Sequence, residues 1–89
     1  MNKKEYYISI NDYCEPWGMK IPKGSILKYL RTFNQEYMWA LCFDEKENQA
    51  YPLIFKKDKV KIIDSEKVKE NIKSAFAEYI DLENNNMLP

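Results

Sequence analysis

The chain has 89 residues, and its 14 lysine and arginine residues balance its 14 aspartate and glutamate residues, so the formal net charge is zero. The length suits one small domain, and 45% hydrophobic with 31% charged residues is a globular composition. No apolar run reaches the roughly 20 residues of a membrane-spanning helix, and we expect no secretion signal. These properties exclude a multidomain enzyme, a membrane protein and a highly charged tail protein, and favour a cytoplasmic location.

The first predicted element is a strand over residues 5–10, in which Tyr6, Ile8 and Ile10 fall on one face. A long connection follows over residues 11–24. It contains both glycines of the chain and several turn-forming dipeptides, so we expect a loop there.

Residues 25–33 are compatible with a strand or with a helix capped by Ser25. We favour the strand, because the next segment is a strand and Asn34-Gln35 suits a tight hairpin between the two. This strand would place Ile26 and Leu30 on one face, and Leu27, Tyr29 and Phe33 on the other.

Residues 36–44 form the clearest strand of the sequence. Its two faces are both apolar, which predicts a central strand covered on both sides. Residues 50–55 form a further strand, where Pro52 has no amide donor and therefore indicates an edge or a bulge. A turn at 56–58 leads into a short last strand over residues 59–63.

Residues 65–82 are predicted to form an amphipathic helix that Asp64 or Ser65 caps. An apolar residue recurs at every fourth position and makes one stripe along this helix; the stripe consists of Val68, Ile72, Phe76 and Ile80. We therefore expect one domain over residues 1–82 and a flexible tail over residues 83–89.

These elements predict a mainly β fold of about five antiparallel strands with one C-terminal helix. The segments Ile21-Pro-Lys-Gly-Ser-Ile-Leu-Lys-Tyr-Leu30, Trp39-Ala-Leu41, Leu53-Ile-Phe55 and Val60-Lys-Ile62 resemble the strands of SH3-like small barrels of phage or mobile-element type. The resemblance covers residues 5–63 and implies an SH3-like small antiparallel barrel. The acidic, tyrosine-rich motif of signalling SH3 domains is absent, so proline-peptide binding is not implied. Lysine-rich, arginine-poor composition also favours a low-GC bacterium or its phage as the source.

The sequence lacks the usual residues of catalytic and metal sites. It contains no histidine and no glycine-rich phosphate loop. Its two cysteines, Cys14 and Cys42, are far apart and do not make a zinc site without histidine. We therefore expect a protein that is not an enzyme and uses no metal ion or cofactor.

The candidate partner-binding site lies in the first loop. Trp17 stands between a proline and a glycine, and aromatic residues in loops are typical of interaction hot spots. The alternative is that Trp17 folds back and closes one end of the barrel. The predicted site binds a protein and consists of Tyr13, Glu15, Trp17, Met19 and Lys20. Such a module suits an accessory or inhibitor protein of a phage or plasmid.

The alternative function is nucleic-acid binding by a basic segment together with aromatic residues of the sheet. The basic residues are Lys56, Lys57, Lys59 and Lys61. The same lysines suit a solvated turn that protects an edge strand. Tyr37, Trp39 and Tyr51 either form a stacking platform or pack beneath the helix. If the helix left them uncovered, a homodimer would cover them, so we expect a monomer or a homodimer.

Overall fold

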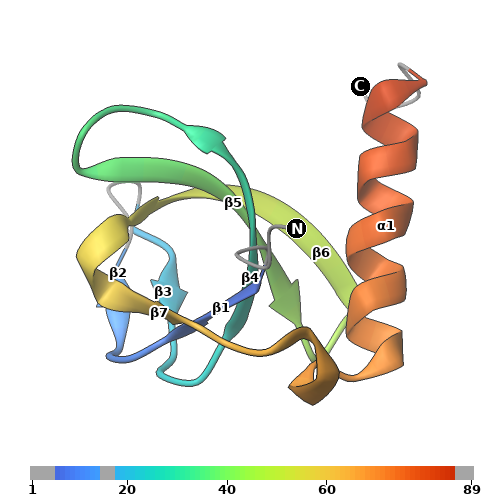
Figure 1. The fold of residues 1–89 in the computed structure, drawn as a ribbon, viewed down its shortest axis with the longest axis horizontal. Helices are drawn as coiled ribbons and strands as arrows, with labels where there is room; N and C mark the ends of the chain where they lie inside the picture. The colour runs from blue at the N-terminus through green and yellow to red at the C-terminus, as the bar shows by residue number, and fades with distance from the viewer. Residues whose placement is uncertain (1–5, 15–17, 86–89) are drawn as a thin grey trace.

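The computed structural model describes residues 6–14 and 18–85. Within them the chain is mainly β with one C-terminal helix, as predicted (Figure 1). The elements are β1 (Tyr6–Ser9), β2 (Tyr13–Cys14), β3 (Lys20–Ile21), β4 (Ile26–Thr32), β5 (Tyr37–Asp44), β6 (Gln49–Lys56), the 3-10 turn η1 (Lys57–Lys59), β7 (Val60–Ile62), the 3-10 turn η2 (Ser65–Lys67) and α1 (Glu70–Asn84).

Five strands form one antiparallel sheet in the order β6-β5-β4-β1-β7, and β2 pairs with β3 in a separate hairpin. The strand β5 is flanked by β6 and β4, which confirms its predicted central position. The strand β6 lies at one end of the order, so Pro52 occupies an edge strand, as its missing amide requires. The order has two ends, β6 and β7, and the sheet is therefore not closed by strand pairing.

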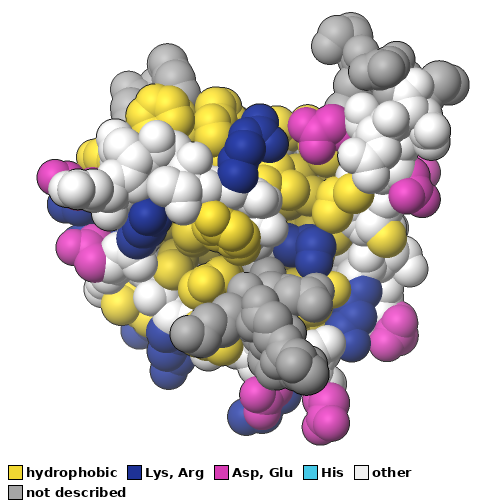
Figure 2. Space-filling view, turned by 45° about the horizontal axis from the view of Figure 1, so that its top comes forward, with side chains coloured by type: hydrophobic (Ala, Val, Ile, Leu, Met, Phe, Trp, Pro, Cys, Tyr) yellow, Lys and Arg dark blue, Asp and Glu magenta, His cyan; other side chains and the backbone are white. Residues whose placement is uncertain are grey.

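Both faces of the sheet are covered by apolar residues. The helix-side cluster lies between the sheet and α1 and contains Tyr6, Leu41, Phe43, Val68, Ile72, Ala75 and Phe76. The inner cluster lies on the opposite face and contains Ile21, Leu27, Met38, Ala40, Cys42, Leu53 and Phe55. This arrangement explains why β5 is apolar on both faces. Part of the apolar surface on the helix side stays visible between the sheet and the helix (Figure 2).

Residues 25–33 contain a strand, and the helix alternative is wrong. The register between β4 and β5 shifts between Tyr29 and Arg31, so Leu30 is an extra residue in a bulge. The bulge reverses the alternation of side chains that follow it. The predicted common face for Leu27 and Phe33 is therefore wrong, because the Phe33 ring contacts Trp39 on the helix side.

The predicted hairpin after β4 exists, but its turn spans four residues, 33–36, and Asn34 acts through its side chain. The Asn34 Oδ1 atom accepts hydrogen bonds from the backbone N–H groups of Glu36 and Tyr37, each at 2.8 Å. Among the described non-glycine residues, positive φ occurs at Asn48 instead. The Asn34 amide thus closes the turn without adopting a left-handed backbone.

We expect Asn34→Ala to lower the free energy of unfolding by about 1–2 kcal/mol, because two turn hydrogen bonds lose their acceptor. Asn34→Asp is the matched control, since a carboxylate retains the acceptor and should preserve most of the stability. Urea unfolding of the three proteins checks this expectation. An equal loss in both variants would mean that the two hydrogen bonds do not stabilise the turn.

The helix begins later than predicted and ends later as well. Asp64 and Ser65 lead into η2 rather than into α1, and the N-cap of α1 is Lys69 without a side-chain cap. Val68 has extended backbone angles, so it lies outside the helix even though it is buried in the helix-side cluster. The helix continues to Asn84, two residues beyond its predicted end at residue 82.

The remainder of the apolar stripe packs as predicted. The ring centroids of Tyr6 and Phe76 lie 6.0 Å apart, which joins α1 to β1. Of the helices in the described part of the chain, none combines the length and the apolar character needed to cross a membrane.

Candidate interaction surfaces

The predicted first loop contains a short hairpin that the sequence did not reveal. Tyr13 of β2 pairs with Ile21 of β3, and Cys14 pairs with Lys20. Met19 and Lys20, both in the predicted site, are exposed on this hairpin, and Met19 is 42% exposed. The predicted site residues Glu15 and Trp17 lie outside the described residues.

Tyr13, another predicted site residue, anchors the hairpin to the inner cluster. Its ring stacks on Phe55 with centroids 4.2 Å apart and planes 25° apart. Its hydroxyl donates a long hydrogen bond, 3.4 Å, to the Ile54 carbonyl on the edge strand β6. Ile21 adds a side chain that is 1% exposed. One face of the Tyr13 ring is therefore used in packing within the protein.

The turn after β3 is tied to β1 and to the residue before β2. The backbone N–H of Lys23 donates to Asp12 Oδ1 at 2.8 Å, and the N–H of Gly24 donates to the Ser9 carbonyl at 2.8 Å. Gly24 has φ +90°, a backbone conformation that glycine adopts without strain. These bonds hold the base of the hairpin in one position.

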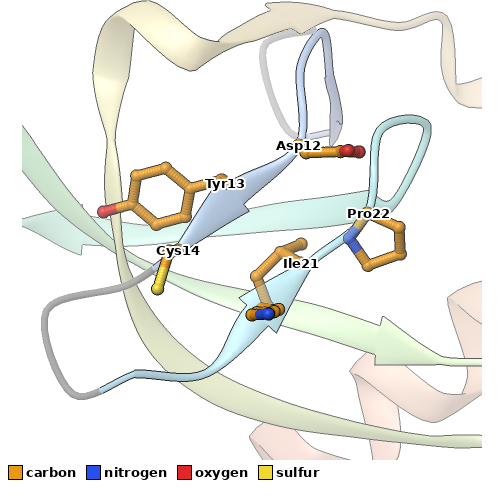
Figure 3. Close-up of a pocket in the computed structure, with 6 residues that line it drawn as sticks. Asp12, Tyr13, Cys14, Ile21 and Pro22 are labelled. Atoms are coloured by element: carbon orange, nitrogen blue, oxygen red, sulfur yellow. The ribbon is translucent and has the colours of Figure 1, made fainter.

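A hollow of about 380 Å³ lies beside the hairpin (Figure 3). Figure 3 shows Tyr13 and Cys14 on one strand and Ile21 on the facing strand. The lining is mainly apolar, with one carboxylate and one ammonium group; it consists of Asp12, Tyr13, Cys14, Lys20, Ile21 and Pro22. This combination is suited to an apolar side chain with a polar neighbour.

The predicted basic segment is divided among three elements. Lys56 ends β6, Lys57 and Lys59 lie in η1, and Lys61 lies in β7. The first three are half-buried, and Lys61 is exposed. Because β6 and β7 are opposite ends of the strand order, the four lysines do not form one basic hairpin.

The predicted aromatic group of the sheet is also divided. Tyr51 pairs with Cys42 and packs against the inner cluster, so its predicted common face with Trp39 is wrong. Trp39 is half-buried on the helix side, where the Phe33 ring meets it edge-on at 6.3 Å and the Arg31 guanidinium carbon lies 5.9 Å from its ring centroid. The bulge in β4, which sequence periodicity does not show, brings these three side chains together.

Arg31 also influences the neighbouring helix. Burial raises the pKa of Tyr79, and the Glu83 carboxylate raises it further, whereas the positive charge of Arg31 lowers it. Arg31 therefore carries its charge at the border between the sheet and α1.

Comparison with known protein families, characterised proteins and solved structures finds no match to this chain. Within residues 6–14 and 18–85, no group of three or more aspartate, glutamate, cysteine or histidine side chains is placed to hold a metal ion. Two surfaces therefore remain as candidates for function, the β2–β3 hairpin and the helix-side face of the sheet around Trp39.

Proposed function

We propose that the protein is a small non-enzymatic binding module with an SH3-like barrel, and that the β2–β3 hairpin engages a protein partner. The observation that supports the proposal is the hollow beside the hairpin, together with the exposed side chain of Met19, which precedes the lining residue Lys20 in the chain. An anchored hairpin presents such a surface at low entropic cost, because its conformation is fixed before binding. An apolar residue exposed beside a hollow is also the pattern of an interaction hot spot.

The charges at the hairpin define the partner more closely. Lys20 and Lys23 are exposed there, whereas Asp12 already accepts a hydrogen bond from the Lys23 backbone. The surface thus favours a protein segment with an apolar side chain for the hollow and a carboxylate for Lys20. In this role the protein would occupy a surface of a bacterial protein in the cytoplasm, as an accessory or inhibitor protein of a phage or plasmid does.

Affinity capture from a bacterial lysate with and without nuclease treatment, followed by measurement of Kd with the captured protein, tests the proposal. We expect Met19→Ala to weaken binding by about 2 kcal/mol, roughly 30-fold in Kd. Lys20→Glu should also weaken it, by charge repulsion. Trp17→Ala extends the test to the predicted site residue outside the described part of the chain.

Leu82→Ala is the matched control, because Leu82 is also an exposed apolar residue but lies on α1. It should leave Kd unchanged. Equal binding by the wild type, Met19→Ala and Lys20→Glu would overturn the assignment of the hairpin, and so would a captured protein that is lost on nuclease treatment.

A further inference from the structure

The helix-side face of the sheet, on the other side from the hairpin, carries cations from three strands. Residues directly opposite in neighbouring strands place their side chains on one face. Lys28 is opposite both Tyr6 and Leu41, which belong to the helix-side cluster. By the same pairing rule, Arg31 is opposite Trp39, Lys56 is opposite Tyr37, and Lys61 is opposite Ile8.

None of the described strands contributes an acidic residue to this face. Among the described strands, the one acidic residue is Asp44, which follows the helix-side residue Phe43 and therefore belongs to the opposite face. Among the described residues outside the strands, Glu36 in the β4–β5 turn and Glu83 on α1 border this face. Figure 2 shows basic side chains set among hydrophobic ones between the sheet and the helix.

Phe33 and Trp39 share this face with Arg31. Phe33 is 53% exposed, the most exposed of the large apolar side chains described. Its ring lies nearly perpendicular to that of Trp39, with an interplanar angle of 86° and centroids 6.3 Å apart. Arg31, at the edge of the same group, is the only arginine of the chain and is exposed. Its planar guanidinium is suited to phosphate oxygens as well as to aromatic faces.

We propose that this face, formed by Arg31, Phe33, Trp39 and Lys56 with Lys28 and Lys61 beside them, binds single-stranded nucleic acid. An exposed aromatic ring beside several cations suits such a ligand, because each base offers a flat face to stack and each nucleotide a phosphate to neutralise. This face lies on the opposite side of the sheet from the hairpin, which covers the inner cluster. Protein binding by the hairpin and nucleic-acid binding by this face can therefore be tested separately.

An acidic protein segment would match the charge of the face equally well, but not its stacking geometry. The cations are spread over three separate strands. The evenly spaced phosphates of a nucleic-acid strand match that spread better than one cluster of carboxylates on a protein would. Acidic protein is therefore the competing outcome of the test.

Fluorescence anisotropy with labelled oligothymidine and oligouridine of about 15 nucleotides tests the proposal. We expect Phe33→Ala to weaken binding about tenfold, the effect of losing one stacked base. Arg31→Gln and Lys56→Gln should weaken it and reduce its salt dependence. For the wild type, log affinity against log salt should have a slope of about −2, corresponding to about three neutralised phosphates. The oligothymidine and oligouridine arms separate DNA from RNA.

Met19→Ala and Leu82→Ala are the controls, and both should bind the oligonucleotides as the wild type does. The thermal midpoint of each variant establishes that it is folded. We expect Phe33→Ala to remain folded, because Phe33 is exposed. The proposal is overturned if neither oligonucleotide binds at low salt, if Phe33→Ala binds as tightly as the wild type, or if affinity is independent of salt. Tighter binding of duplex DNA, or equal competition by polyglutamate, would overturn it as well.

Discussion

Replacing Phe76 by alanine is expected to remove about 3–5 kcal/mol from the free energy of unfolding, the usual cost of emptying a large aromatic site in a core. Phe76 is 0% exposed and belongs to the helix-side cluster. Its ring lies 6.0 Å from that of Tyr6, so it joins α1 to the sheet at β1. A domain of this size has only about 5–15 kcal/mol to lose, and a substantial unfolded population should therefore appear.

Urea unfolding followed by circular dichroism measures this loss. Glu78→Ala is the control on the same helix, since Glu78 is exposed and a surface change should stay within about 0.5 kcal/mol. A loss of less than about 1 kcal/mol of unfolding free energy in Phe76→Ala would contradict the packing of α1 on the sheet, because removing a buried phenylalanine ring costs more than that.

The long strands and the helix stripe could be predicted because each has a periodic pattern with one physical cause. The central strand β5 is apolar on both faces, since a separate cluster covers each of them. Pro52 marked the edge strand because a proline cannot donate to a neighbour on that side. In these cases a local sequence property depends directly on the position of the element in the sheet.

Other features could not be predicted, because their causes lie outside the local pattern. The strands β2 and β3 have two residues each, which is too short for any alternation to be recognised. The bulge at Leu30 depends on pairing with β5, and it moved Phe33 to the helix side. Asp64 and Ser65 resemble a helix cap, yet η2 and the extended Val68 separate them from α1.

The candidate surfaces were predicted in part, for the same reason. Alternation places Tyr51 and Trp39 each on a face of its own strand, but only the register between β5 and β6 shows that these faces differ. Met19 and Lys20 are exposed on the hairpin, whereas Tyr13 of the same predicted site stacks on Phe55. Composition alone does not distinguish an aromatic residue that binds a partner from one that anchors its own loop.

Replacing Phe55 by alanine is the second change with a large expected effect, again about 3–5 kcal/mol of unfolding free energy. Phe55 is 0% exposed in the inner cluster. Unlike Phe76, it supports a surface element, because the Tyr13 ring stacks on it at 4.2 Å. The loss should therefore include both a core cavity and a loosened β2–β3 hairpin.

A double-mutant cycle of Phe55→Ala and Tyr13→Ala separates these two contributions by urea unfolding. The stacked pair should give a coupling energy of about 0.5–1.5 kcal/mol, so that the double variant loses less than the sum of the single losses. Tyr13→Phe is the control; it keeps the ring but removes the hydroxyl that donates the 3.4 Å hydrogen bond to Ile54, and it should cost less than about 1 kcal/mol. Additive losses would show that the hairpin is held without this stacking contact. A measured coupling would mean that the fold itself orders the hairpin, and a partner bound there would gain affinity from that order.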